Sequence, residues 1–496
     1  MSAMMKGVLS QTSAEVEADL TQFLARETFS ELEAWVLSPE ALRAPLDAVE
    51  QEIERRAREV ARLALQANID RRGTGYHGPA LVVTGPSGER RRQVAKREDT
   101  RHVVSLFGEV GVVRTAYTAP GAETVRLLDA ELHLPQKSLS YEMQRRLVDE
   151  AVRGPFDEAV AAVEKNTGNA VAKRTAEQVT VDKARDFDAF YEQRTAPAAE
   201  ATGPLLVSAV DCKGVPVVKP DGAQHSARRK KGEKANKKKM ATVAAVFTQQ
   251  RRIRTAEDVV ASLFDDIPVP STARVRPEHK RVWASLEKEQ EAVFREVAVE
   301  IAARDPLGQK EHVMVTDGER RLRKAALKTF PDVLLILDLL HVLEYLWKTA
   351  HAFYGEGSPE AEAWVRSHAL MILQGRVSQV VKGMRQSATK RKLIGARRKA
   401  VLGAAAYFYT NRDRMRYHVY LARGLPIASG AVEGACKNLI KDRMERSGMR
   451  WQIPGAEAML KLRAIYLSGD MDEYWRFHKQ QEQSRLYAQQ HWRTAS

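Results

Sequence analysis

Apolar and polar positions follow two different periods along the chain, and the changes of period divide it into segments. Apolar residues fall at helical spacing through Val16, Leu20 and Phe23, and the same spacing returns from Ile53 onward. Residues 13–68 are therefore predicted to be helical. A Gly-rich stretch ends this unit.

A β-rich segment comes next. Two short alternating runs, Arg101–Leu106 and Val110–Tyr117, are joined by Phe107-Gly108-Glu109, which is typical of a β-hairpin. From residue 140 to residue 187 the pattern is helical again.

Within this helical stretch, two helices flank the turn Lys165–Gly168, and Lys173, Arg174 and Lys183 follow the turn. The spacing fits a helix-turn-helix whose basic residues face a DNA groove, and it fits two packed amphipathic helices equally well.

A linker rich in Ala and Pro, residues 195–204, opens the second half. The elements predicted after it are strand 205–211, its hairpin partner 214–219, strand 242–247, a long helix 277–303, strand 312–316, a short helix, strand 332–339 and helix 341–354. That order is typical of an RNase H-like mixed sheet. Residues 355–425 are helical and basic, and we expect an insertion that folds as a separate unit.

The sequence thus predicts an α/β protein with three regions. Residues 1–75 form a helical region, and residues 76–200 form a β-hairpin plus helical, helix-turn-helix-like DNA-binding region. Residues 201–496 form an RNase H-like catalytic domain with an all-α insertion at about 355–425.

Charge and cysteine content narrow the function. A formal charge of +15 and a pI near 9.6 favour a polyanionic partner, because each neutralised phosphate releases condensed counterions. No apolar run approaches the roughly 20 residues of a spanning helix, so we expect no membrane association and a cytoplasmic location. Two cysteines exclude a disulfide scaffold. Strand alternation places Cys212 on the opposite face from Asp211, which disfavours a catalytic thiol.

Three isolated acids have the positions that a metal site requires. Asp211 and Asp317 each end a predicted strand, and Glu433 lies in the first turn of a predicted helix. Carboxylate oxygens suit Mg²⁺, and two ions about 3.5–4 Å apart can align attacking and leaving oxygens on phosphorus. Each acid also has an ordinary interpretation: Asp317 precedes Gly318 in a turn signal, and Glu433 forms an i,i+4 pair with a lysine.

Basic residues surround these acids. Residues 228–239 form either a solvated loop or a phosphate clamp, and the clamp is favoured because the loop lies between two predicted strands beside Asp211. The helix that follows Glu433 is basic on its flanking faces. The residues predicted to contact DNA are Lys213, Arg228, Arg229, Lys230, Lys231, Lys237, Lys238, Lys239, Lys437, Lys441, Arg443, Arg446, Arg450 and Trp451.

At these positions the chain resembles a known family, the Mutator-related DDE transposases of the ISKra type found in bacterial insertion sequences. The resemblance spans roughly residues 204–487 and is most specific in its last third. The motifs that carry it are Val210–Pro216, Thr316–Glu319, Asp338–His341, Ala428–Cys436, Lys441–Met444, Ser447–Trp451 and Ser468–Trp475.

The resemblance implies an RNase H-like core with Asp211, Asp317 and Glu433 as metal ligands, two Mg²⁺ or Mn²⁺ ions, and a role for His341 near the site. Taken alone, His341 and the acid one turn before it indicate a capping Asp and a packed His. Family members usually have Gly where Cys212 stands, and many have a Cys-rich knuckle that residues 117–128 lack.

The function expected is that of a DNA transposase. It would bind the terminal inverted repeats of its own element, cut at the ends and join them to target DNA, as a homodimer or larger assembly in the bacterial nucleoid. Two alternatives stay open: another RNase H-fold nuclease such as a junction resolvase, and a domesticated DNA-binding protein without catalysis.

Overall fold

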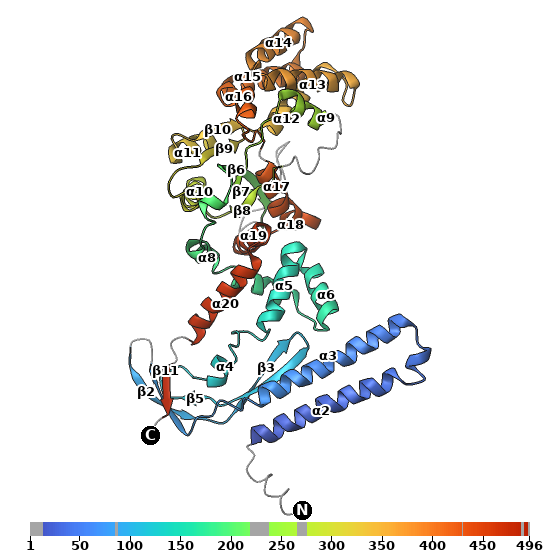
Figure 1. The fold of residues 1–496 in the computed structure, drawn as a ribbon, viewed down its shortest axis with the longest axis vertical. Helices are drawn as coiled ribbons and strands as arrows, with labels where there is room; N and C mark the ends of the chain where they lie inside the picture. The colour runs from blue at the N-terminus through green and yellow to red at the C-terminus, as the bar shows by residue number, and fades with distance from the viewer. Residues whose placement is uncertain are drawn as a thin grey trace, which may run out of the picture. The chain divides into compact units, whose positions relative to one another are not determined.

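A computed structural model describes residues 13–84, 88–218, 238–264, 275–428, 430–487 and 491–494. The chain divides into two compact units. The first comprises residues 1–190 together with 472–496, and the second comprises residues 191–471. Helices and mixed sheets make up the described chain (Figure 1).

The first unit begins with an antiparallel helical hairpin. Helix α2 (Ser13–Val36) packs along α3 (Leu46–Asp70), and the short 3-10 turn η1 (Ala41–Arg43) lies between them. The face of α2 that meets α3 buries small and apolar side chains, among them Ala18 and Leu32. The helical prediction for residues 13–68 is confirmed.

Strands follow the hairpin. Strands β3 and β4 form the predicted β-hairpin, in which Ser105 pairs with Gly108 across a two-residue turn. A second sheet has the order β11-β1-β2-β5. The strands are β1 (Ala80–Thr84), β2 (Arg90–Ala95), β3 (Asp99–Ser105), β4 (Gly108–Arg114), β5 (Tyr117–Thr118) and β11 (His491–Thr494).

The helices of this unit are α4 (Leu127–Glu131), α5 (Tyr141–Arg153), α6 (Phe156–Thr167), α7 (Lys173–Lys183), α8 (Phe187–Gln193) and α20 (Met471–Tyr487), of which α8 and α20 run across its boundary. Gly168, with φ +69°, ends α6 in a left-handed conformation. Lys183 is 2% exposed and its ammonium contacts Glu482 at 2.6 Å. The expectation that Lys183 faces a DNA groove is therefore wrong, because burial removes its charge from any groove.

The second unit is built on a five-stranded mixed sheet with the order β10-β9-β6-β7-β8. Strand β6 is parallel to β9, and β9 to β10, whereas β7 is antiparallel to both β6 and β8. The strands are β6 (Leu205–Pro216), β7 (Lys238–Gln249), β8 (Glu278–Ser285), β9 (Glu311–Thr316) and β10 (Leu334–Leu337).

One strand prediction is wrong and one helix prediction is wrong in its first half. Residues 214–219 are not a hairpin partner, since β6 continues to Pro216 and pairs with β7 over its whole length. Gly214 marks close packing rather than a turn: a Cβ there would lie 2.8 Å from the side chain of Lys238. The helix predicted over residues 277–303 begins only at Gln290, as α10 (Gln290–Arg304), and residues 278–285 form strand β8. The first half of β8 is charged and its buried residues form a continuous run, so the sequence shows no strand alternation there.

Helices make up most of the rest of this unit. They are α9 (Ala256–Phe264), α10 (Gln290–Arg304), α11 (Arg320–Thr329), α12 (Leu339–Phe353), α13 (Pro359–Leu373), α14 (Val377–Lys390), α15 (Gly395–Asn411), α16 (Tyr417–Ala422), α17 (Gly430–Ala435), a π-helical segment (Cys436–Lys441), α18 (Asp442–Met444) and α19 (Ile453–Ser468). None of the described helices has the length and apolar composition needed to cross a bilayer.

The helices that follow α12 share one core with the sheet. Val207 of β6 and Val313 of β9 belong to the same cluster of buried residues as Val365 of α13 and Phe408 of α15. The separate folding expected for residues 355–425 is therefore wrong. Because they are continuous with the sheet, these helices can carry side chains to the ends of its strands.

Candidate metal centre at the ends of the central strands

Asp211 lies on strand β6, and Asp317 directly follows β9, the parallel neighbour of β6. Ala209 of β6 is the partner of Val315 of β9, and each acid follows two residues later. Because side chains alternate along a strand, Asp211 leaves β6 on the same side of the sheet as Ala209. Burial raises the pKa of Asp317, and the negative charge of Asp211 raises it further. The backbone N–H of Glu319 donates to Asp317 Oδ1 at 2.9 Å.

Glu433 reaches the same edge of the sheet from helix α17. This helix packs against β6 and β7. One turn later, the Cys436 thiol donates to Asp211 Oδ2 at 3.2 Å, which places this face of the helix against the first acid. Burial raises the pKa of Glu433, as do the charges of Asp338 and Asp211. The predicted N-cap of this helix, Ser429, lies outside the described residues.

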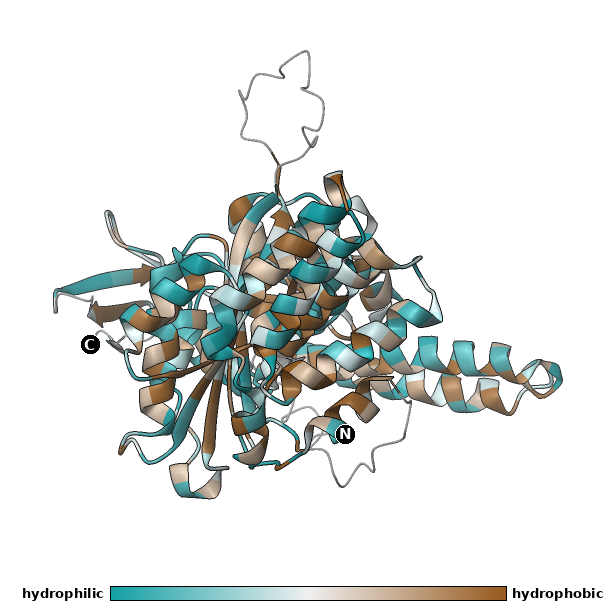
Figure 2. Ribbon diagram, turned by 90° about the horizontal axis from the view of Figure 1, so that it is seen from above, coloured by the Kyte–Doolittle hydropathy of each residue, from teal (hydrophilic) through white to brown (hydrophobic). Residues whose placement is uncertain are grey.

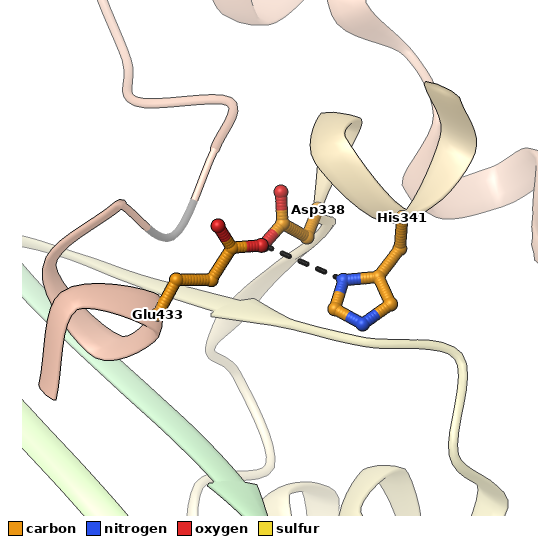
Figure 3. Close-up of side chains that lie close together, drawn as sticks. All are labelled: Asp338, His341 and Glu433. Atoms are coloured by element: carbon orange, nitrogen blue, oxygen red, sulfur yellow. Dashed lines mark ion pairs between the residues drawn. The ribbon is translucent and has the colours of Figure 1, made fainter. Parts of the chain in front are cut away.

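A third element adds two more groups. Asp338 is fully buried and caps α12, accepting a hydrogen bond from the N–H of Leu340 at 2.8 Å. His341, one turn along, has its Nδ1 at 3.7 Å from Asp338 Oδ2. One ligand atom each from Asp338, His341 and Glu433 lie within 4.8 Å of one another (Figure 3). The capping role expected for the acid is confirmed.

His341 is the cation of this cluster. The nearby carboxylate of Asp338 raises the pKa of His341 to about 9, against the opposing effect of burial. The ring is thus an imidazolium at neutral pH. A divalent ion at this place would take over the position of that charge and displace the proton.

The donor set fits a divalent metal ion. Asp211, Asp317, Asp338 and Glu433 supply carboxylate oxygens within electrostatic reach of one another, and His341 supplies a nitrogen. Mg²⁺ and Mn²⁺ both accept carboxylate ligands, and imidazole suits Mn²⁺ better than Mg²⁺. The sequence predicts Asp211, Asp317 and Glu433 as metal ligands, and the family resemblance adds His341; Asp338 was expected only to cap a helix.

The helices between the last two acids contribute supporting residues that sequence reasoning missed. Arg414 is 4% exposed, and its Nη1 donates to Thr316 Oγ1 at 3.1 Å and to the carbonyl oxygen of Asp317 at 3.3 Å. The Tyr407 ring lies against Gly318, where an added Cβ would be 2.1 Å from the ring. Both residues fix the loop that carries Asp317. Their sequence context, helical and partly apolar, gives no sign of this role.

Two of the residues expected to contact DNA are buried. Arg443 is fully buried and its guanidinium lies 4.9 Å from the centre of the Trp451 ring. Trp451 is 7% exposed and its Nε1 donates to the carbonyl oxygen of Met444 at 3.0 Å. The expectation of direct DNA contact by this pair is wrong, because both side chains are used in packing.

The other basic residues divide into three groups. Arg228, Arg229, Lys230, Lys231 and Lys237 lie outside the described residues. Lys238 and Lys239 belong to strand β7 instead of a loop. The ammonium of Lys238 contacts Glu445 Oε1 at 2.7 Å. Lys213 is half-buried near the acids, and the exposed group is Lys437, Lys441, Arg446 and Arg450.

Comparison with known proteins adds little. No protein-family model matches the chain, and no curated protein matches it. A solved structure described as the "Drosophila P element transposase strand transfer complex" is similar with a TM-score of 0.26 and 8% identity, over 70% of this chain and 81% of that chain. A likeness at this level leaves function to be inferred from the site itself.

Proposed function

We propose that this protein is a DDE-type DNA transposase with an RNase H-like core, related to the ISKra-type enzymes of bacterial insertion sequences. The observation that carries the proposal is that Asp211 lies on β6 and Asp317 directly follows the adjacent parallel strand β9, with Glu433 on a helix packed against β6 and β7. The three acids come from distant parts of the sequence, 222 residues from first to last, and the negative charge of Asp211 raises the pKa of both Asp317 and Glu433. Among the described residues, the group whose ligand atoms lie within 4.8 Å of one another is Asp338, His341 and Glu433.

The sheet supports the same class of fold. Its five strands, with β7 antiparallel to β6 and β8 and with β6, β9 and β10 parallel, form a mixed sheet of the kind that the proposed RNase H-like core would have. The helices between Asp317 and Glu433 correspond to the insertion that the family resemblance implies.

In the proposed reaction, two Mg²⁺ or Mn²⁺ ions would neutralise charge on the phosphate and activate the attacking oxygen. Asp211, Asp317 and Glu433 would hold them. Asp211 is already oriented by the Cys212 N–H and the Cys436 thiol, at 2.6 and 3.2 Å. The oxygen of a water attacks phosphorus in cleavage and releases a 3′-hydroxyl. That hydroxyl then attacks a phosphodiester of the target, whose own 3′ oxygen leaves.

His341 has a separate role in this proposal. Its imidazolium, held by Asp338, supplies positive charge beside Glu433 and can hold a proton at Nδ1 or yield it when a cation enters. The residue acts through the electrostatics of the site.

The positive charge of the chain favours DNA as its partner. The chain carries +15 overall, and Lys437, Lys441, Arg446 and Arg450 are exposed on the segment that follows Glu433. We propose that terminal inverted repeats and target DNA bind here, with pairing of two ends by a homodimer or larger assembly.

The test is a cleavage assay with Mg²⁺ and duplex DNA carrying the sequences that flank the gene. The wild type should cut at the element ends, and Glu433→Gln should bind but not cut. Glu445→Gln is the matched control, since Glu445 pairs with Lys238 in the same segment and should stay active. Cutting of branched DNA without preference for element ends would instead favour a junction nuclease. Binding with no cutting by the wild type would favour a DNA-binding relic.

A further inference from the structure

The segment that contains helices α14 and α15 holds most of the net charge of the chain. Residues 363–412 contain eleven Lys and Arg and neither Asp nor Glu, so one tenth of the chain supplies +11 of its net +15. The two helices pack against each other and lie together in Figure 1. A positive excess of this size in one place favours a polyanionic partner.

Five exposed residues form one surface across these two helices, which we call the α14–α15 basic face: Lys382, Arg385, Arg398, Tyr409 and Arg412. The guanidinium carbons of Arg385 and Arg412 lie 5.7 and 4.4 Å from the centre of the Tyr409 ring. Lys382 is one turn before Arg385, and Arg398 is three turns before Tyr409, so each lies on the same side of its helix as the residue it precedes. The face is about 16 Å long between Arg398 and Tyr409.

The basic face is the solvent side of both helices. Val380, Val381 and Met384 of α14 belong to the core that these helices share with the sheet, as do Val401 and Phe408 of α15. Hydrophilic and hydrophobic residues accordingly alternate along the helices in Figure 2, as expected of helices that are buried on one side.

The charges of the basic face are not balanced by the protein. Within the described chain, none of its four basic residues forms an ion pair. The arginines of α3 at positions 55, 56 and 58 differ, because each pairs with a glutamate of the same helix. A solvated helix commonly balances its charges in that way. Unbalanced like charges repel one another, so an anion that binds among them relieves this repulsion.

We propose that the α14–α15 basic face binds the phosphate backbone of duplex DNA without regard to base sequence. That the polyanion is DNA rests on the proposed transposase function, whereas the face itself rests on charge and geometry. None of its residues is among those that the sequence predicts to contact DNA, and it lies on helices other than the segment that follows Glu433. Its length matches about five base pairs, which are 3.4 Å apart along a duplex.

The environment of Tyr409 favours a duplex over single-stranded nucleic acid. Proteins that bind single strands stack bases on free aromatic rings. The Tyr409 ring is 49% exposed, but the guanidinium of Arg412 already lies over it. The ring therefore orients the arginine through a cation–π contact. An anionic membrane is disfavoured, because membrane-surface helices insert an apolar side, and the apolar sides of α14 and α15 are packed in the core.

The experiment measures the salt dependence of DNA binding by the full-length chain. Fluorescence anisotropy follows binding to a random-sequence duplex of about 30 base pairs, in EDTA and over a range of KCl concentrations. The variant combines Lys382→Gln, Arg385→Gln and Arg398→Gln. Each lost phosphate contact removes about 0.9 from the slope of log K against log salt, so the slope should fall by about 2–3 and affinity at 0.1 M salt by at least about tenfold.

The control removes the same charge elsewhere. Arg26→Gln, Arg43→Gln and Arg55→Gln change exposed residues of the α2–α3 hairpin, where α2 has six acids and a single basic residue. This variant should keep the wild-type slope. Circular dichroism should be the same for all three proteins, because every substituted side chain is exposed.

Three results would overturn the proposal. A wild-type slope in the first variant would show that the face does not contact DNA. An equal fall in the control would show that net charge, and not this face, governs binding. Loss of binding to phosphatidylglycerol vesicles with DNA binding intact would identify the face as a membrane surface. None of these measurements involves cleavage, so they are independent of the Glu433→Gln test of the transposase assignment.

Discussion

The thiol of Cys436 donates a hydrogen bond to Asp211 Oδ2 over 3.2 Å, although 225 residues separate the two in the chain. The other oxygen of Asp211 accepts from the N–H of Cys212 at 2.6 Å. These two bonds hold the carboxylate in one orientation and leave it further lone pairs for a cation. The contact also fixes the helix of Glu433 against the first strand of the sheet, so a single interaction aligns two of the three proposed metal ligands.

We predict that Asp211→Asn abolishes DNA cleavage while DNA binding changes by less than about twofold. The amide keeps the size of the side chain but loses the charge that a metal ion needs. Gel-shift and cleavage assays on the same DNA measure the two effects. Joint loss of binding and cleavage would indicate that Asp211 is structural.

Both cysteines should resist alkylation in the folded protein. Burial raises the pKa of the Cys436 thiol, and the charge of Asp211 raises it further; burial also raises the pKa of Cys212. The thiolate is the reactive form, so iodoacetamide at pH 8 should label the native chain far more slowly than the chain unfolded in urea. Rapid labelling of Cys212 in the native protein would revive the catalytic-thiol hypothesis.

Gly318→Ala should destabilise the protein by about 1–3 kcal/mol and reduce cleavage, because the new methyl group would overlap the Tyr407 ring. In a Tyr407→Ala background the same substitution should cost almost nothing. Urea unfolding of the four variants gives this coupling. Gly403→Ala, on the same helix as Tyr407 and with open space around it, is the control and should not destabilise. Equal costs in both backgrounds would show that the ring does not position this loop.

His341 should stabilise the metal-free protein at neutral pH and not at high pH. Its pKa is raised to about 9, so the protonated ring contributes stability that is fully present below about pH 6.5 and is lost as pH rises through 9. His341→Gln should therefore lower the free energy of unfolding by roughly 2 kcal/mol at pH 6, and by little at pH 10.

Urea unfolding in EDTA measures this dependence. His351→Gln, near the end of the same helix, provides the matched control for removing an imidazole from α12. A cost for His341→Gln that stays constant with pH would mean that the ring contributes by packing alone.

Local pattern predicted the strand ends well and strand pairing poorly. Asp211 and Asp317 follow runs of buried residues, and such runs can be recognised in the sequence as apolar stretches. Gly214 resembles a turn residue until its neighbour in space, Lys238, is known. Strand β8 was missed because its first half is charged and its buried residues form a continuous run. A continuous buried run does not show the alternation that marks a strand in a sequence.

The candidate site shows the same limit. Asp338 could be predicted as a helix cap, but its proximity to Glu433 depends on how α12 and α17 pack at the end of the sheet. Arg414 and Tyr407 support Asp317 only because their helices share a core with the sheet. For Arg443 and Trp451 the sequence predicted a DNA contact. In the structure, this basic and this aromatic residue pack on each other instead.

The most direct test of the metal centre is a change of metal preference in Asp317→Cys, assayed by cleavage of end-bearing DNA in Mg²⁺ and in Mn²⁺. A thiolate binds the hard Mg²⁺ ion poorly and accepts Mn²⁺ better. If Asp317 contacts the ion, the variant should be inactive in Mg²⁺ and regain activity in Mn²⁺, while Asp317→Ala should be inactive in both. Equal activity of Asp317→Cys in the two metals, or activity of Asp317→Ala, would contradict a metal centre at the ends of these strands.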